Sequence, residues 1–140
     1  MRFYEARSTI AAEPEAIWSV LVDVPGYPTW DSGVERVEGR VALGERLRVF
    51  VRANPGKAFP VKVAALTPPT AMRWTGGMPL GLFTGTRTYS LGAQGDGTTT
   101  FTMREEYTGP LAGLIGKSIP DLQPAFDEFA LCLKREAERR

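Results

Sequence analysis

The chain has 140 residues, of which 43% are hydrophobic and 24% charged, and its 17 Lys and Arg against 16 Asp and Glu give a formal net charge of +1. This length suits one domain, residues 1–140. The balanced charge gives no excess of basic residues, which argues against a nucleic-acid-binding protein. There is no His, which removes His-based acid–base catalysis and the commonest transition-metal ligand, and the single cysteine, Cys132, excludes an internal disulfide. We therefore expect no metal and no cofactor.

The first residues, MRFYEARSTI, contain no apolar stretch long enough for a signal peptide or a membrane span. The default expectation is a soluble, cytoplasmic protein without stable membrane insertion, present as a monomer or a homodimer. A strand is predicted from Phe3 to Ala11. The segment AAEPEAIWSVLVDV then predicts a helix that begins near Pro14, with its apolar face at helical spacing: Ile17, Trp18, Leu21 and Val22.

The stretch PGYPTWDSG places two large aromatics, Tyr27 and Trp30, among residues that usually form turns. Residues Asp23 to Pro28 end the first helix, and YPTW can form a second short one. Two roles are open for these rings, which are packing in the core and lining a ligand site. Packing is favoured, because large apolar side chains are core residues far more often than ligand contacts.

The hydrophobic period then changes from 3.6 to 2, which predicts an antiparallel meander. Alternating runs over 46–53, 59–65, 72–75, 83–91 and 100–107 are separated by the turn sequences NPGK, TPPT, GGMPLG and AQGDG. One face of these strands is apolar and the other is rich in Thr, Arg and Lys, as in an antiparallel sheet with one face exposed to solvent. The predicted cross-strand partners are Val51 and Val61, Val63 and Trp74, Ala65 and Met72, Trp74 and Phe83, Tyr89 and Phe101, and Gly85 and Glu105.

Two charged residues, Arg87 and Glu105, fall on the apolar face and are predicted to be diagonal neighbours. Because an unpaired charge in an apolar interior is costly, the two should meet or find other partners. They are read either as a structural ion pair, which is favoured, or as a polar anchor that orients an apolar ligand. Gly85 beside them predicts a bulge or spare room for a ligand.

The C-terminal part predicts a long helix, with apolar residues at spacings of three and four: Ile119, Leu122, Phe126, Phe129 and Leu133. Ser118 and Pro120 suit its start, whereas Pro124 has to lie in the first turn or at a kink. Cys132 is expected to be a buried structural thiol. The basic end, KREAERR, is expected to be a solvated helix terminus.

The ordered segments STIAAEPEAIWSVLVDVPGYPTWDSGVERVEG, MRWTGGMPLGLFTGTRTYSL and TTFTMREEYTGPLAGLI resemble the START and birch-pollen-allergen (SRPBCC) superfamily, in its polyketide cyclase/dehydrase-like branch. Ser32 and Tyr107 stand where Pro and Phe are common in that branch. The resemblance implies an α+β helix-grip fold, in which a seven-stranded curved antiparallel sheet wraps around a long C-terminal helix and two short helices follow the first strand. The superfamily has no universal catalytic set, so no catalytic residue is carried over.

From this fold we expect a hydrophobic small molecule, such as a lipid, a polyketide or an isoprenoid-like compound, to bind between the sheet and the C-terminal helix. Alternatives are a polyketide cyclase or dehydratase that moves a proton with Glu105 or Tyr89, and a protein-interaction module of the chaperone-activator type. The predicted lining residues are Trp30, Val51, Phe59, Val61, Met72, Trp74, Phe83, Arg87, Tyr89, Phe101, Met103, Glu105, Leu122, Phe126 and Phe129.

Overall fold

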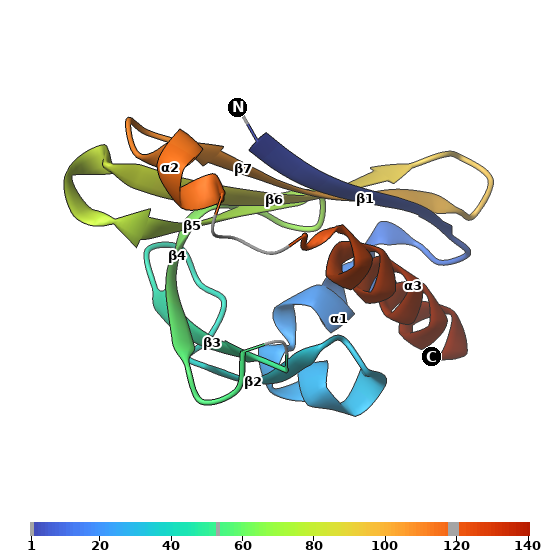
Figure 1. Cartoon of the computed structure of the whole chain (residues 1–140). Coiled ribbons are helices and arrows are strands. Elements are labelled where there is room, and N and C mark those ends of the chain that lie inside the picture. Colours follow the sequence, from blue (N-terminus) through green and yellow to red (C-terminus); the bar gives the residue numbers. More distant parts are fainter. Residues whose placement is uncertain (1, 53, 118–120) are drawn as a thin grey trace.

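The computed structural model describes residues 2–52, 54–117 and 121–140. Its seven strands form one antiparallel sheet in the order β1-β7-β6-β5-β4-β3-β2. The strands are β1 (Arg2–Ile10), β2 (Val34–Glu38), β3 (Arg46–Val51), β4 (Ala58–Thr67), β5 (Ala71–Met78), β6 (Phe83–Ala93) and β7 (Thr99–Thr108). Figure 1 shows the sheet curling between β1 and β2, with the long helix α3 (Gln123–Arg139) on its concave side. The predicted helix-grip architecture is confirmed.

The two short helices after the first strand are also confirmed, as α1 (Pro14–Val22) and the 3₁₀ helix η1 (Val24–Trp30). In α1 the buried side includes Val20 and not Val22, which is half-exposed. A single 3₁₀ turn, η2 (Pro79–Gly81), and a short helix, α2 (Ala112–Gly116), were not expected from the sequence. Pro124 lies in the first turn of α3, where its missing N–H interrupts no helical hydrogen bond.

The predicted start of the last helix at Ser118 and Pro120, together with Ile119, lies outside the described residues. Within the described ranges, no helix is both long enough and apolar enough to cross a membrane.

Most strand faces follow the prediction, but several registers do not, and beyond a bulge in β4 the concave face carries Leu66 instead of the predicted Ala65. Val63 pairs with Trp74 as expected, and a bulge then shifts the partner of Met72 from Ala65 to Leu66. The other hairpins are displaced by an even number of residues, which preserves the face. The observed partners are Leu47 and Val61, Trp74 and Arg87, Tyr89 and Met103, and Arg87 and Glu105.

The outer edge of β1 is closed by side chains of α3 and the residues beside it. The Gln123 side chain donates to the carbonyl of Glu5 (2.7 Å) and its amide oxygen accepts from the Glu5 N–H (3.4 Å). Farther along, Lys134 donates to the carbonyl of Thr9 (3.0 Å) and Glu138 accepts from the N–H of Ala11 (2.8 Å). These bonds fix α3 against the first strand, so the helix is held across the concave face of the sheet.

Candidate ligand-binding site

A charged cluster lies on the concave face where β6 and β7 run side by side. Arg87 is directly opposite Glu105, with its Nε 3.3 Å from Oε1 and its Nη2 donating to Oε2 at 3.3 Å. The hydroxyl of Tyr107 donates to Oε2 of the same carboxylate at 2.6 Å. The carboxylate therefore receives a cation and a neutral donor, which satisfies most of its hydrogen-bonding capacity.

The cluster faces α3. The Arg87 guanidinium lies 4.8 Å from the ring centre of Phe126, a cation–π contact with the helix. The side chains of Arg87 and Glu105 keep 28% and 16% of their exposure, so solvent reaches both. Burial alone would lower the pKa of Arg87, but the charge of Glu105 outweighs it and the pKa is raised. Arg87 is therefore permanently cationic.

Two tyrosines beside the cluster stay neutral. Burial raises the pKa of Tyr89, although the nearby Arg87 cation opposes the shift. Burial also raises the pKa of Tyr107, and the Glu105 carboxylate adds to this because it disfavours a second negative charge. Both phenols therefore act as hydrogen-bonding groups near neutral pH.

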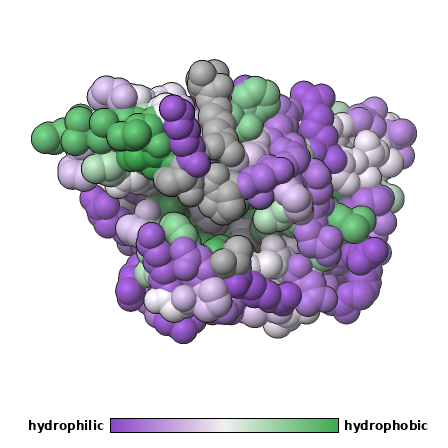
Figure 2. Space-filling model, viewed as in Figure 1, coloured by the Kyte–Doolittle hydropathy of each residue, from purple (hydrophilic) through white to green (hydrophobic). Residues whose placement is uncertain are grey.

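Other apolar side chains on the concave face, and Leu122 at the start of α3, are only partly buried. Those that pack on the edge of the core are Val49, Val51, Val61, Phe83 and Leu122. Phe59 on β4 is more open, at 37% exposure, with the Lys57 ammonium 5.4 Å from its ring centre. Figure 2 shows the molecule hollowed on this side, between the main part of the sheet above and the strands β2 to β4 below. The registers of β3 to β7 place these apolar side chains, Leu122 apart, and the charged cluster on one face of the sheet.

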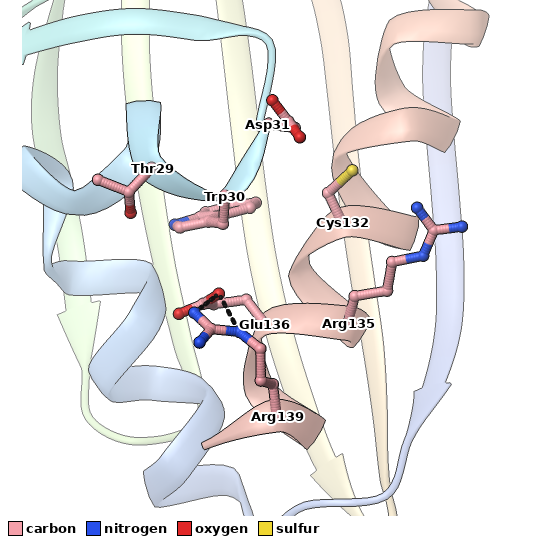
Figure 3. A pocket seen from close by; sticks show the side chains of 7 residues that line it. All are labelled: Thr29, Trp30, Asp31, Cys132, Arg135, Glu136 and Arg139. Atoms are coloured by element: carbon pink, nitrogen blue, oxygen red, sulfur yellow. Dashed lines mark hydrogen bonds and ion pairs between the residues drawn. The ribbon is translucent and has the colours of Figure 1, made fainter.

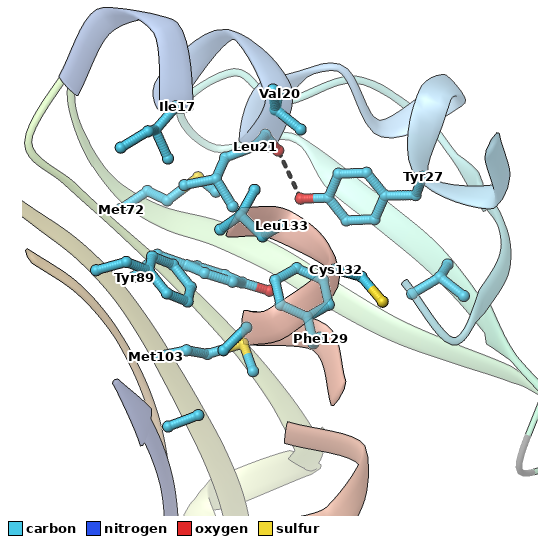
Figure 4. Close-up of a cluster of buried hydrophobic side chains, with 14 of the residues drawn as sticks. Ile17, Val20, Leu21, Tyr27, Met72, Tyr89, Met103, Phe129, Cys132 and Leu133 are labelled. Carbon is cyan, nitrogen blue, oxygen red and sulfur yellow. Dashed lines mark hydrogen bonds between the residues drawn. The ribbon is translucent and has the colours of Figure 1, made fainter. Parts of the chain in front are cut away.

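The other predicted lining residues lie in the packed core, each 6% exposed or less: Trp30, Met72, Trp74, Tyr89, Phe101, Met103, Phe126 and Phe129. Figure 4 shows Tyr89, Met103 and Phe129 meeting Leu133 and residues of α1 in one cluster. The Phe129 ring lies within 6.5 Å of the rings of Tyr89 and Phe101, measured between centres. Side chains therefore fill this deeper part of the grip in the described structure.

The glycine beside the charged pair does not leave the room that the sequence suggested. A Cβ built on Gly85 would lie 3.4 Å from the ring of Tyr107, which occupies that side of the strand. Tyr107 in turn stacks on Phe83, with ring centres 5.6 Å apart and planes at 12°. Tyr107 was not among the predicted site residues, although its position two residues after Glu105 put it on the same face.

The turn aromatics pack in the core. Trp30 contacts Phe129 and Tyr27 edge to face, at 5.2 Å and 5.3 Å between ring centres. The Tyr27 hydroxyl donates to the carbonyl of Leu21 at 2.5 Å. Ser32 accepts from the N–H of Val34 and donates to the carbonyl of Tyr27, which holds the turn closed. These contacts join η1 to α1 and α3.

A pocket of about 250 Å³ lies between η1 and α3, with Trp30 in its wall. Its lining is mostly polar and consists of Thr29, Trp30, Asp31, Cys132, Arg135, Glu136 and Arg139, as Figure 3 shows. Burial and the neighbouring Glu128 raise the pKa of Cys132, so this thiol is not activated. Among the described residues, no cluster of His, Cys, Asp and Glu could hold a metal ion.

Several solved structures share this fold. An aromatase/cyclase from a Streptomyces species matches with a TM-score of 0.73 at 18% identity, over 99% of this chain and 94% of that one. Norcoclaurine synthase from Thalictrum flavum, in complex with dopamine and hydroxybenzaldehyde, matches with a TM-score of 0.71 at 15% identity, over 99% and 87%. A START superfamily protein from Mycobacterium smegmatis matches with a TM-score of 0.66 at 19% identity, over 98% and 97%. These likenesses establish the fold.

No curated protein matches the chain. The family model described as polyketide cyclase/dehydrase and lipid transport matches residues 1–138. The chain therefore belongs to the polyketide cyclase/dehydrase and lipid transport family.

Proposed function

We propose that this protein binds a hydrophobic small molecule, such as a lipid, a polyketide or an isoprenoid-like compound, in the hollow between the sheet and α3. The observation that carries the proposal is the Arg87–Glu105 pair, which stays partly exposed on a concave face that also carries half-buried apolar side chains and which accepts a hydrogen bond from the buried Tyr107. A purely structural ion pair would need no such open apolar surroundings. Apolar walls with a few convergent polar groups are typical of small-molecule sites.

Arg87 can make a polar contact with the ligand. Its side chain is 28% exposed, and among the described residues its Nε has no aligned hydrogen-bond acceptor, although Oε1 of Glu105 lies 3.3 Å away. A buried N–H without an acceptor costs free energy, which a carbonyl or hydroxyl oxygen of a ligand would recover. Apolar burial would supply most of the affinity, at roughly 25 cal/mol per Å² before the costs of association.

The test combines native mass spectrometry with titration of the fluorescent probe 1-anilinonaphthalene-8-sulfonate. We expect a co-purifying apolar compound in the first measurement and saturable probe binding in the second. Val61→Glu places a charge in the hollow and should lower the affinity for the probe about tenfold or more. Ala64→Glu, on the exposed side of the same strand, is the matched control and should leave it unchanged. Equal probe affinity of both variants and the parent protein would refute a site in the hollow.

A cyclase or dehydratase activity is the second candidate, and the contact between Glu105 and Tyr107 favours it. A carboxylate that accepts from a phenol and remains reachable from the hollow is placed to take or return a proton. The Streptomyces aromatase/cyclase shares the fold, which permits this chemistry without assigning it. Glu105→Gln separates the two candidates. In either case the variant should keep its affinity for the compound that co-purifies. Only an enzyme would also show turnover of that compound, which the variant would lose.

A further inference from the structure

Large apolar side chains project from the end of the sheet where β5 turns into β6. Leu80, in the turn η2, is 94% exposed, and Met78, at the end of β5, is 42% exposed. Leu114 of α2 is 70% exposed. Figure 2 shows hydrophobic surface gathered over the β5–β6 turn and α2, at the upper left of the view. We call Met78, Leu80 and Leu114 the apolar tip.

The turn and the short helix are joined, so the tip is one surface. The N–H of Leu111, just before α2, donates to the carbonyl of Leu82 at 3.0 Å. A Cβ on Gly109 would lie 2.6 Å from the carbonyl oxygens of Gly81 and Leu82, so the two segments touch at the backbone. The segment that carries Leu114 is therefore held against the turn that carries Leu80.

The conformation of Leu80 offers no benefit to the isolated molecule. Its φ of 62° and ψ of 22° lie in the left-handed region, where a side chain with a Cβ is disfavoured and Gly or Asn is usual. The side chain also makes almost no contact that removes it from water. A strained, fully exposed leucine is better explained by a contact that forms outside the folded monomer.

The charges around the tip indicate what that contact is. The sequence has no Asp or Glu in residues 68–95 or 107–120, although it has 16 elsewhere. Lys117, directly after α2, is exposed. An apolar projection without carboxylates, whose helix α2 is followed by an exposed cation, complements an anionic lipid surface. We propose that the apolar tip docks reversibly on an anionic bilayer, with Leu80 entering between the headgroups.

A bilayer suits the tip better than a second copy of the chain. The tip projects around a single turn, whereas a symmetric dimer interface needs a broader, self-complementary surface. Phe83, two residues after the turn, stacks on Tyr107, which donates to Glu105, so docking would bring this end of the candidate site to the lipid surface. The docking goes beyond the proposed ligand binding and does not depend on it.

Co-sedimentation of the full chain with vesicles tests the proposal. With phosphatidylcholine vesicles that contain about 30% phosphatidylglycerol, we expect binding that weakens as salt rises, and little binding to phosphatidylcholine alone. Leu80→Glu should lower the partition coefficient about tenfold or more. Leu43→Glu is the control, because Leu43 is 67% exposed but lies in the connection between β2 and β3. Circular dichroism of each variant confirms that the fold is intact.

Two outcomes would overturn the inference. One is a parent protein that fails to sediment with anionic vesicles, or that loses binding equally with Leu80→Glu and Leu43→Glu. The other is a concentration-dependent dimer, measured by light scattering after size exclusion, that Leu80→Glu dissociates, because the tip would then be a protein interface. Neither outcome affects probe binding in the hollow, so the two proposals fail separately.

Discussion

Arg87 and Glu105 are direct cross-strand partners, and their side chains meet on the face of the sheet that looks toward α3. The contact is closer than the diagonal arrangement that the sequence suggested. Because neither side chain is more than a third exposed, removal of one partner leaves a charge with reduced access to water.

A double-mutant cycle measures this coupling. Arg87→Met leaves the Glu105 carboxylate without its cation and should lower the free energy of unfolding by about 1–3 kcal/mol. Adding Glu105→Gln to that variant should recover part of the loss, because an amide can still accept from Tyr107. Urea unfolding of the four proteins gives the coupling energy. Additive effects of the two substitutions would show that the pair does not interact in solution.

The bond from Tyr27 to Leu21 should contribute to stability, because its hydroxyl is buried. Tyr27→Phe leaves the Leu21 carbonyl without this donor and should cost about 1–2 kcal/mol of unfolding free energy. Thr29→Ala removes an exposed hydroxyl bond to Gly26 in the same turn and should cost much less. Thermal unfolding of both variants gives the comparison, and equal losses would contradict the assigned role of burial.

Glu136 predicts a pH dependence near the C-terminus. Hydrogen bonds from Arg139 and Arg140 lower the pKa of Glu136 below its ordinary value of 4.5, although burial opposes the shift. A lowered folded-state pKa stabilises the protein above the unfolded value, and this contribution is lost as the pH falls through the folded value. Glu136→Gln should therefore be less stable at pH 7, by under about 1 kcal/mol since Arg139 is largely exposed.

The gap in melting temperature between the parent protein and Glu136→Gln should close in acid. A gap that stays constant from pH 7 to well below 4.5 would exclude the ionised carboxylate as its source.

Cys132 should react slowly with thiol reagents. The residue is 5% exposed, and burial raises the pKa of its thiol above the ordinary value. Labelling with 5,5′-dithiobis(2-nitrobenzoate) should therefore be far slower in the folded protein than in urea. Labelling as fast as that of a free thiol would show that the contact between η1 and α3 opens readily.

Leu80→Gly should raise stability while it weakens vesicle binding. Glycine relieves the left-handed strain and loses no packing, since Leu80 is 94% exposed. We expect a gain of about 0.5–1 kcal/mol, or roughly 2–4 °C in melting temperature. A lower melting temperature would show that the side chain stabilises the folded monomer, which would remove the argument from its conformation.

The faces of the strands were predictable from the sequence except beyond the bulge in β4, and the strand ends were not. GGMPLG was read as a turn, whereas Gly76 and Gly77 belong to β5 and the turn begins at Pro79. A Cβ on Gly76 would lie 2.7 Å from the carbonyl of Pro60, so this glycine serves a close approach between strands. Because the turn was placed too early, the predicted pairing in this hairpin was shifted by four residues. The predicted face is still correct, because the shift is an even number of residues.

The composition of the candidate site was predictable only in part. Alternation placed Arg87 and Glu105 on the concave face, but it could not separate the packed residues from those in the hollow, because that depends on how side chains fill the space under α3. The two departures from the family pattern, Ser32 and Tyr107, acquire a physical reason only in the structure. Each uses its hydroxyl for a hydrogen bond that Pro or Phe could not make.

The contact between Gln123 and Glu5 also bears on aggregation. A free edge strand offers its backbone to other chains and can start intermolecular sheet growth. The Gln123 amide occupies the N–H and carbonyl of Glu5 much as a neighbouring strand would. At the opposite edge, β2 is only five residues long and carries Arg36 and Glu38. A long β1 is thus shielded and a short β2 is charged, which should keep the curled sheet from polymerising even when the protein is concentrated.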